Sequence, residues 1–141
     1  MKKFGGIYKY LNEDAVLNSF ITEIEDNKLH FILPLFRDAW QSEFWKTKGY
    51  DGASVVQDEY HPRLANFIHD YMYRVGMGGI ESDIIYRELL ILTGTKKTKA
   101  YTRYYSIRTA WNTYFKWKHL INKNVKSLSI NALEVYLIFV K

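Results

Sequence analysis

The chain contains no cysteine and only two prolines, Pro34 and Pro62, among its 141 residues. The lack of cysteine excludes disulfides, thiolate metal ligands and a cysteine nucleophile. A domain of this size does not need disulfides, so their absence favours folding inside a cell only slightly. No stretch rich in proline, glycine and serine divides the chain. We therefore expect a single domain over residues 1–141.

Long apolar runs are also missing. The longest extends from Val135 to Val140, which is far too short to cross a bilayer. Lys2 and Lys3 resemble the start of a signal peptide, but no apolar run follows them before Asn12. We therefore expect a soluble protein without a leader peptide or a membrane-spanning segment.

Aromatic residues are abundant, with 12 Tyr, 8 Phe and 4 Trp, and the hydrophobic fraction is 48%. This composition predicts a packed core rather than a disordered chain. The net charge of +5 is unevenly placed, because nine Lys/Arg and no acidic residue lie between Lys96 and Lys126. All 15 acidic residues lie in the rest of the chain, together with the other 11 basic residues, so the rest of the chain is net acidic. A basic block of this kind suits phosphates or an acidic partner surface.

In the first third of the chain, the segments Val16 to Ile24 and Leu29 to Leu33 fit either strands or short helices, and we interpret the region as β-structure. We interpret the segment from Ser19 to Glu25 as strand-like, and the turn candidate Asp26-Asn27 follows. We expect a hairpin from about Phe20 to Leu33, and a loop from Lys46 to Ser54 where glycines supply turn chemistry.

The rest of the chain predicts about three helices. The first begins near Pro62 and ends at the glycines after Val75, the second runs from Ser82 as N-cap to Gly94, and the third spans roughly residues 97–119. The tail, residues 128–140, fits a buried strand or helix. The expected fold class is therefore α+β, with N-terminal strands or a hairpin followed by a helical region.

The first of these helices carries an adjacent His69-Asp70 pair, and Asp83 lies near the start of the second. Two antiparallel helices joined through residues 75–81 would bring Asp83 opposite His69. A carboxylate on one histidine nitrogen fixes the tautomer and strengthens the other nitrogen as a base. Asp70 would then be available to hold a hard cation. The same residues also suit a buried hydrogen-bond network that locks two helices together, so both readings stay open.

A series of short motifs in order resembles a bacteriophage-borne family of unknown function. The motifs are Tyr50-Asp51-Gly52-Ala53-Ser54, His61-Pro62, the segment from His69 to Arg74, Ser82-Asp83, and the aromatic-basic helix through Arg108. Together they cover roughly Asp51 to Trp111. Val55-Val56 stands where the family usually has Ile-Pro. The resemblance implies a phage or prophage origin and carries no established activity.

The same helix pair is also similar to phospholipase A2. This resemblance implies His69 as the base, Asp83 and Tyr73 as its supports, and calcium held by Asp70 and by Asp51 in the loop. In that chemistry histidine activates a water molecule and calcium stabilises the oxyanion. The chain lacks the cysteines and the fuller glycine loop of those enzymes.

The basic third helix is a candidate partner-binding surface, because its cations alternate with Tyr and Trp. Nucleic acid and other protein subunits are both candidate partners. The residues concerned are Lys96, Lys97, Lys99, Arg103, Arg108, Lys116 and Lys118.

Three functions remain open from sequence. The first is a virion protein that packs among phage tail, neck or capsid subunits, made in the host cytoplasm and then carried in the virion. The second is a small hydrolase that uses His69 and Asp70, with calcium as the one cofactor considered. The third is a nucleic-acid-binding module. A homo-oligomer is compatible with all three.

Overall fold

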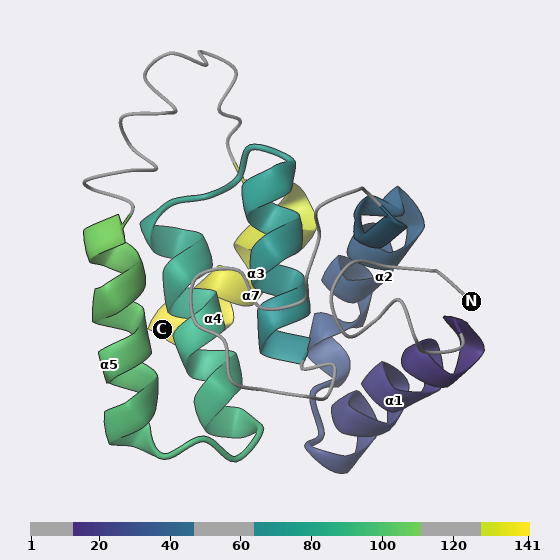
Figure 1. Ribbon diagram of the computed structural model, residues 1–141, viewed down its shortest axis with the longest axis horizontal. Coiled ribbons are helices and arrows are strands. Elements are labelled where there is room, and N and C mark those ends of the chain that lie inside the picture. Colours follow the sequence, from purple (N-terminus) through teal and green to yellow (C-terminus); the bar gives the residue numbers. More distant parts are fainter. Residues whose placement is uncertain (1–12, 47–63, 111–127) are drawn as a thin grey trace.

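The computed structural model describes residues 13–46, 64–110 and 128–141, and within these ranges the fold is all-α (Figure 1). No strand occurs in the described ranges, so the α+β prediction is wrong. The α-helices are α1 (Glu13–Asp26), α2 (Leu33–Ser42), α3 (Leu64–Arg74), α4 (Ile80–Leu92), α5 (Lys97–Ala110) and α7 (Ile130–Val140). Short 3-10 turns, η2 (His30–Ile32) and η3 (Phe44–Lys46), lie before and after α2.

Helix α1 and turn η2 occupy the region where a hairpin was predicted. Val16, Phe20 and Ile24 are buried and lie four residues apart, which is the spacing of one face of a helix. Asp26 ends α1, and the next turn bends at Lys28, whose φ of 58° is left-handed. The alternation that suggested a strand is therefore the buried side of a helix.

An aromatic cluster holds α1, α2 and α3 together. The Phe67 ring on α3 lies 4.5 Å from the Phe20 ring and 5.8 Å from the Phe36 ring, measured between ring centroids. The Trp40 and Phe44 rings also contact Phe67, at 6.0 and 4.9 Å. Offset and tilted rings at these distances attract one another in addition to the area that they bury. This cluster fixes one side of α3.

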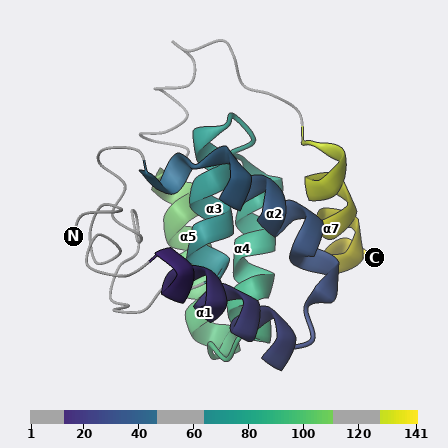
Figure 2. The same cartoon turned by 90° about the vertical axis from the view of Figure 1, so that its right-hand side faces the viewer.

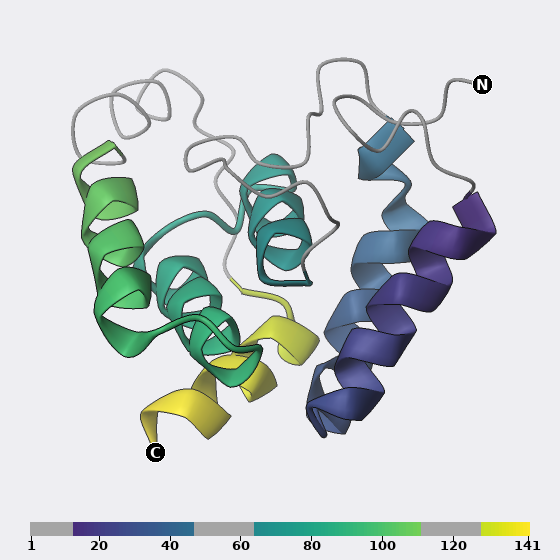
Figure 3. The same ribbon diagram turned by 60° about the horizontal axis from the view of Figure 1, so that its bottom comes forward.

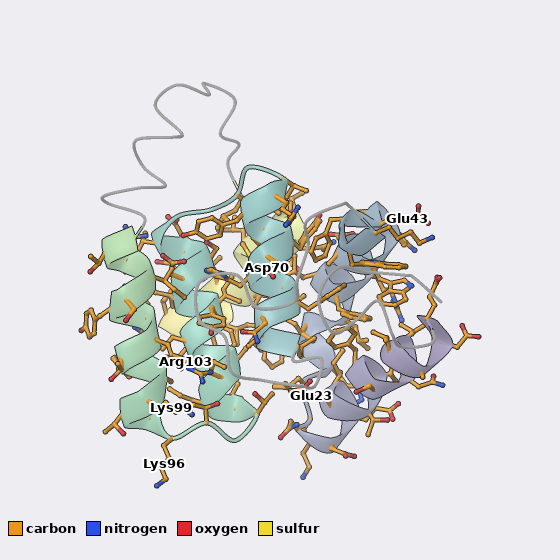
Figure 4. All side chains as sticks on the ribbon, viewed as in Figure 1. Glu23, Glu43, Asp70, Lys96, Lys99 and Arg103 are labelled. Atoms are coloured by element: carbon orange, nitrogen blue, oxygen red, sulfur yellow. The ribbon has the colours of Figure 1, made fainter. Side chains whose placement is uncertain are left out.

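Helix α3 lies in the middle of the molecule. Helices α4 and α5 follow on one side of it, and α1 and α2 lie on the other (Figure 1, Figure 3). Residues 64–72 are all buried. The backbone N–H of Leu64 donates to Oε1 of Glu23 at 3.0 Å, so a side chain from α1 caps the first turn of α3 (Figure 4). The helix that carries His69 and Asp70 is therefore held from both sides and at its N-terminus.

Helix α7 settles the open choice between strand and helix for the tail. Ser129 caps it, with Oγ accepting from the N–H of Ala132 at 3.2 Å. It packs against α4 and α2 (Figure 2) and buries Ala132 and Val135. Its exposed residues are mostly apolar, with Glu134 exposed among them: Ile130, Leu133, Leu137, Ile138 and Val140. Among the described helices, none is long and apolar enough to cross a membrane.

Candidate functional site

The side chains of His69 and Asp83 meet where α3 packs on α4. Nε2 of His69 lies 2.7 Å from Oδ1 of Asp83. The connection between the two helices is short, and Met77 N–H donates to the carbonyl oxygen of Met72 at 2.7 Å to close the turn. The predicted approach of Asp83 to His69 is therefore confirmed. The second helix begins slightly earlier than expected, at Ile80, so Ser82 lies inside α4 rather than at its N-cap.

Two further side chains donate to the same carboxylate. The hydroxyl of Tyr73 donates to Oδ1 of Asp83 at 2.8 Å, and Nη1 of Arg108 donates to Oδ2 at 2.8 Å. Asp83 therefore joins three helices, because His69 and Tyr73 belong to α3 and Arg108 belongs to α5. Burial and the neighbouring Asp83 carboxylate raise the pKa of Tyr73, so its hydroxyl stays protonated and remains a donor at neutral pH. We refer to these four residues as the Asp83 network.

The Asp83 network is nearly closed to water. Asp83 is 0% exposed and His69 is 6% exposed, whereas the Arg108 side chain is 19% exposed. A carboxylate accepts hydrogen bonds, so the contact with Asp83 places a proton on Nε2 of His69. In the neutral imidazole, Nδ1 then carries the lone pair and is the nitrogen that could accept a proton.

Aromatic rings fix the position of the imidazole. The His69 ring lies 4.6 Å from the Tyr73 ring and 4.7 Å from the Tyr86 ring, measured between centroids. Both rings are tilted by about 40° to the imidazole (42° and 41°). Tyr86 belongs to α4 and is buried. His69 is therefore held by one hydrogen bond and by rings from both helices, which favours a single rotamer.

Gly78 determines how Tyr73 can lie. A Cβ added at Gly78 would come within 2.7 Å of the Tyr73 ring, closer than real Cβ contacts. We expect Gly78→Ala to push this ring away from Asp83 and to lower the free energy of unfolding by about 1–3 kcal/mol, as overpacking does. Urea denaturation checks this value, with Gly94→Ala as the control, because Gly94 has open space around its Cβ position. A Gly78→Ala protein of wild-type stability would contradict the placement of Tyr73.

The Gly94 control needs one further measurement, because φ at Gly94 is 108° and this conformation is itself strained for alanine. The control therefore measures backbone strain without a steric clash. Near-UV circular dichroism of the tyrosines separates the two effects. We expect the tyrosine signal to change in Gly78→Ala and to stay unchanged in Gly94→Ala.

The predicted calcium ligands are not brought together by the described residues. Asp70 is buried at 7% exposure on α3, and Asp51 lies outside the described residues. Within the described ranges, no group of three or more His, Asp and Glu residues could hold a metal ion. Because Asp51 lies outside the described residues, its distance from Asp70 is not described, and the calcium hypothesis stays a prediction.

The five predicted partner-binding residues that the structure describes do not form one surface. Lys96, Lys97 and Lys99 are exposed at the start of α5 (Figure 4), whereas Arg103 is buried and Arg108 belongs to the Asp83 network. The remaining two predicted residues, Lys116 and Lys118, lie outside the described residues.

Another basic residue of this region, Arg87, has a structural role that the sequence did not predict. Its guanidinium lies over the rings of Tyr101 and Tyr104, at 4.5 and 4.8 Å from the centroids. Part of the basic-aromatic pattern therefore packs α4 against α5 and does not face a partner.

No protein-family model, curated protein or solved structure matches this chain. The resemblances to a phage family and to phospholipase A2 therefore stay predictions.

Proposed function

We propose that this protein is a small ester hydrolase in which His69 is the general base. The observation that carries the proposal is the 2.7 Å contact between Nε2 of His69 and Asp83, supported by the Tyr73 hydroxyl on the same oxygen. A histidine with one nitrogen held by a buried carboxylate is a common arrangement for a general base.

The chemistry follows from the two ring nitrogens. For this reaction, water and the ester must reach Nδ1 of a histidine that is 6% exposed. Nδ1 then takes a proton from the water molecule as the water oxygen attacks the ester carbonyl. Asp83 stabilises the imidazolium that forms and keeps its orientation. When the tetrahedral intermediate collapses, the C–O bond to the alcohol breaks, and the proton passes from Nδ1 to the leaving alkoxide. The products are a carboxylic acid and an alcohol, and the imidazole returns to its neutral form.

The substrate class is a carboxylic ester, with phospholipids and soluble esters as the two sources to compare. The test is hydrolysis by the purified full-length chain of phosphatidylcholine or phosphatidylglycerol vesicles and of short-chain p-nitrophenyl esters, each with calcium and with EDTA. Turnover of any of these above the buffer rate supports the proposal. If the folded protein hydrolyses none of them, the proposal is wrong and the role of the Asp83 network is to hold the helices together.

The second candidate function is a virion-associated subunit that packs against other phage structural proteins. The observation that favours it is the exposed apolar outer side of α7, where Ile130 is 76% exposed and Ile138 is 49% exposed. Contiguous apolar surface on a small protein often marks a protein–protein contact. In this case the chain is made in the host cytoplasm and is then built into the particle.

The virion hypothesis is tested on particles rather than on the isolated chain. Mass spectrometry of purified virions should find the protein at a fixed ratio to the major capsid protein. Substitution of Leu133 and Leu137 by serine should lower that ratio, because both side chains lie on the exposed side of α7. Particles that lack the wild-type protein altogether would remove this candidate.

A further inference from the structure

Arg108 differs from the other basic residues of α5. It lies in the last turn of the helix, 25 residues after Asp83, and reaches across to α4, where Nη1 contacts Oδ2 of Asp83 at 2.8 Å. The exposed lysines of this region, Lys96, Lys97 and Lys99, lie at the other end of α5. The sequence presents all of these residues as one basic surface, whereas the structure separates Arg108 from it.

We infer that Arg108 is the positioning residue of the proposed hydrolase, because it supplies the positive charge that keeps the buried Asp83 carboxylate in place for His69. This inference rests on the proposed function for its consequence in catalysis. The geometry behind it is independent of that function. Arg108 touches neither His69 nor any reacting atom in the described structure, and it acts through Asp83.

The two oxygens of Asp83 have different partners. Oδ1 accepts from Nε2 of His69 and from the Tyr73 hydroxyl, and Oδ2 accepts from Arg108. The contact on Oδ2 therefore limits rotation of the carboxylate and keeps Oδ1 directed at His69. Arginine suits this task because its guanidinium is always charged and presents donors in a fixed plane.

Charge balance gives the same role to Arg108. Asp83 is 0% exposed, and transferring an unpaired carboxylate away from water costs far more than a hydrogen bond returns. Without the guanidinium, the buried carboxylate would lose its counter-charge and its contact at Oδ2. The carboxylate could then rotate away from His69, and its contact would no longer keep the proton on Nε2.

The partial exposure of Arg108 makes the inference testable by chemical rescue. Its side chain is 19% exposed, so removing it opens a path from solvent to Oδ2 of a carboxylate that is otherwise sealed. In Arg108→Ala, a free guanidinium ion can enter this space and pair with Asp83. Tetramethylammonium carries the same charge without hydrogen-bond donors and is the control ion.

The experiment combines a spectroscopic and a kinetic reading on the full-length chain. In ¹⁵N-detected spectra of the histidine side chains, wild type should show His69 protonated on Nε2. Arg108→Ala should lose this single-tautomer signature, and millimolar guanidinium should restore it, whereas tetramethylammonium should not. On any ester that wild type hydrolyses, kcat of Arg108→Ala should fall about tenfold to a hundredfold with KM nearly unchanged.

The conservative variant Arg108→Lys keeps the charge and should retain most of the Nε2 tautomer signature and most of kcat. If Arg108→Ala fails to fold, the same two measurements are made on Arg108→Lys. Arg37→Ala is the matched control, because Arg37 is exposed on α2. An unchanged tautomer in folded Arg108→Ala, or a collapse of the signature in Arg108→Lys equal to that in Arg108→Ala, would overturn the inference. If wild type hydrolyses nothing while the tautomer responds as expected, the proposed function fails and the positioning role stands.

Discussion

Replacing His69 by glutamine is expected to lower kcat/KM for ester hydrolysis by about 10²–10⁴-fold, the usual contribution of a general base. Glutamine is chosen because its amide N–H can still donate to Oδ1 of Asp83, the partner of Nε2 in the wild-type protein. The variant therefore keeps the contact between α3 and α4 while it removes the basic nitrogen. Alanine would remove both and would leave a cavity between the Tyr73 and Tyr86 rings.

His30→Gln is the matched control for this experiment. His30 is exposed on the turn between α1 and α2 and lies outside the Asp83 network, so hydrolysis by His30→Gln should equal that of wild type. Initial rates are measured with substrate well below KM, and circular dichroism verifies the fold of each variant. Equal rates for folded His69→Gln and wild type would exclude His69 as the base, and any hydrolysis would then come from another site.

Helices α3, α4 and α5 could be predicted from the sequence, because the apolar pattern of each is long enough to show the helical period. In α5, the buried residues Ala100, Tyr104 and Ile107 repeat every three or four positions. In α1, the short window from Ser19 to Glu25 fits both periods, because Phe20 and Ile24 share a face of a helix and also a face of a strand. The buried Val16, one turn earlier, lay outside that window. Its burial together with Phe20 and Ile24 shows that the helical period is the one the structure uses.

The candidate site was predictable where it depends on neighbouring elements. A short connection between two amphipathic helices makes them pack together, so the approach of Asp83 to His69 follows from local spacing. Arg108 could not be found in this way, because its contact depends on how a third helix docks and because a cation among other cations suggests an exposed surface. The close approach of Gly78 to Tyr73 likewise depends on packing, and no sequence pattern predicts it.

Substitution of Asp83 by asparagine is expected to lower the free energy of unfolding by about 3–5 kcal/mol, the cost of breaking a buried ion pair by removing one partner. Asparagine has almost the same shape, so the loss arises from charge and hydrogen bonding rather than from a cavity. One amide oxygen replaces two carboxylate oxygens, whereas His69, Tyr73 and Arg108 all donate in the wild-type protein. The amide also presents N–H groups toward donors, and the guanidinium loses its counter-charge.

The control for this substitution is Asp26→Asn, because Asp26 is exposed at the end of α1 and should change stability by less than about 0.5 kcal/mol. Urea or guanidinium chloride unfolding, followed by circular dichroism, gives both values from the midpoint and slope. A loss below about 1 kcal/mol for Asp83→Asn would mean that water reaches the carboxylate in solution. The network would then lock three helices only weakly. A loss of the expected size in a protein without hydrolase activity would instead identify Asp83 as a structural lock, because the same three donors account for the stability.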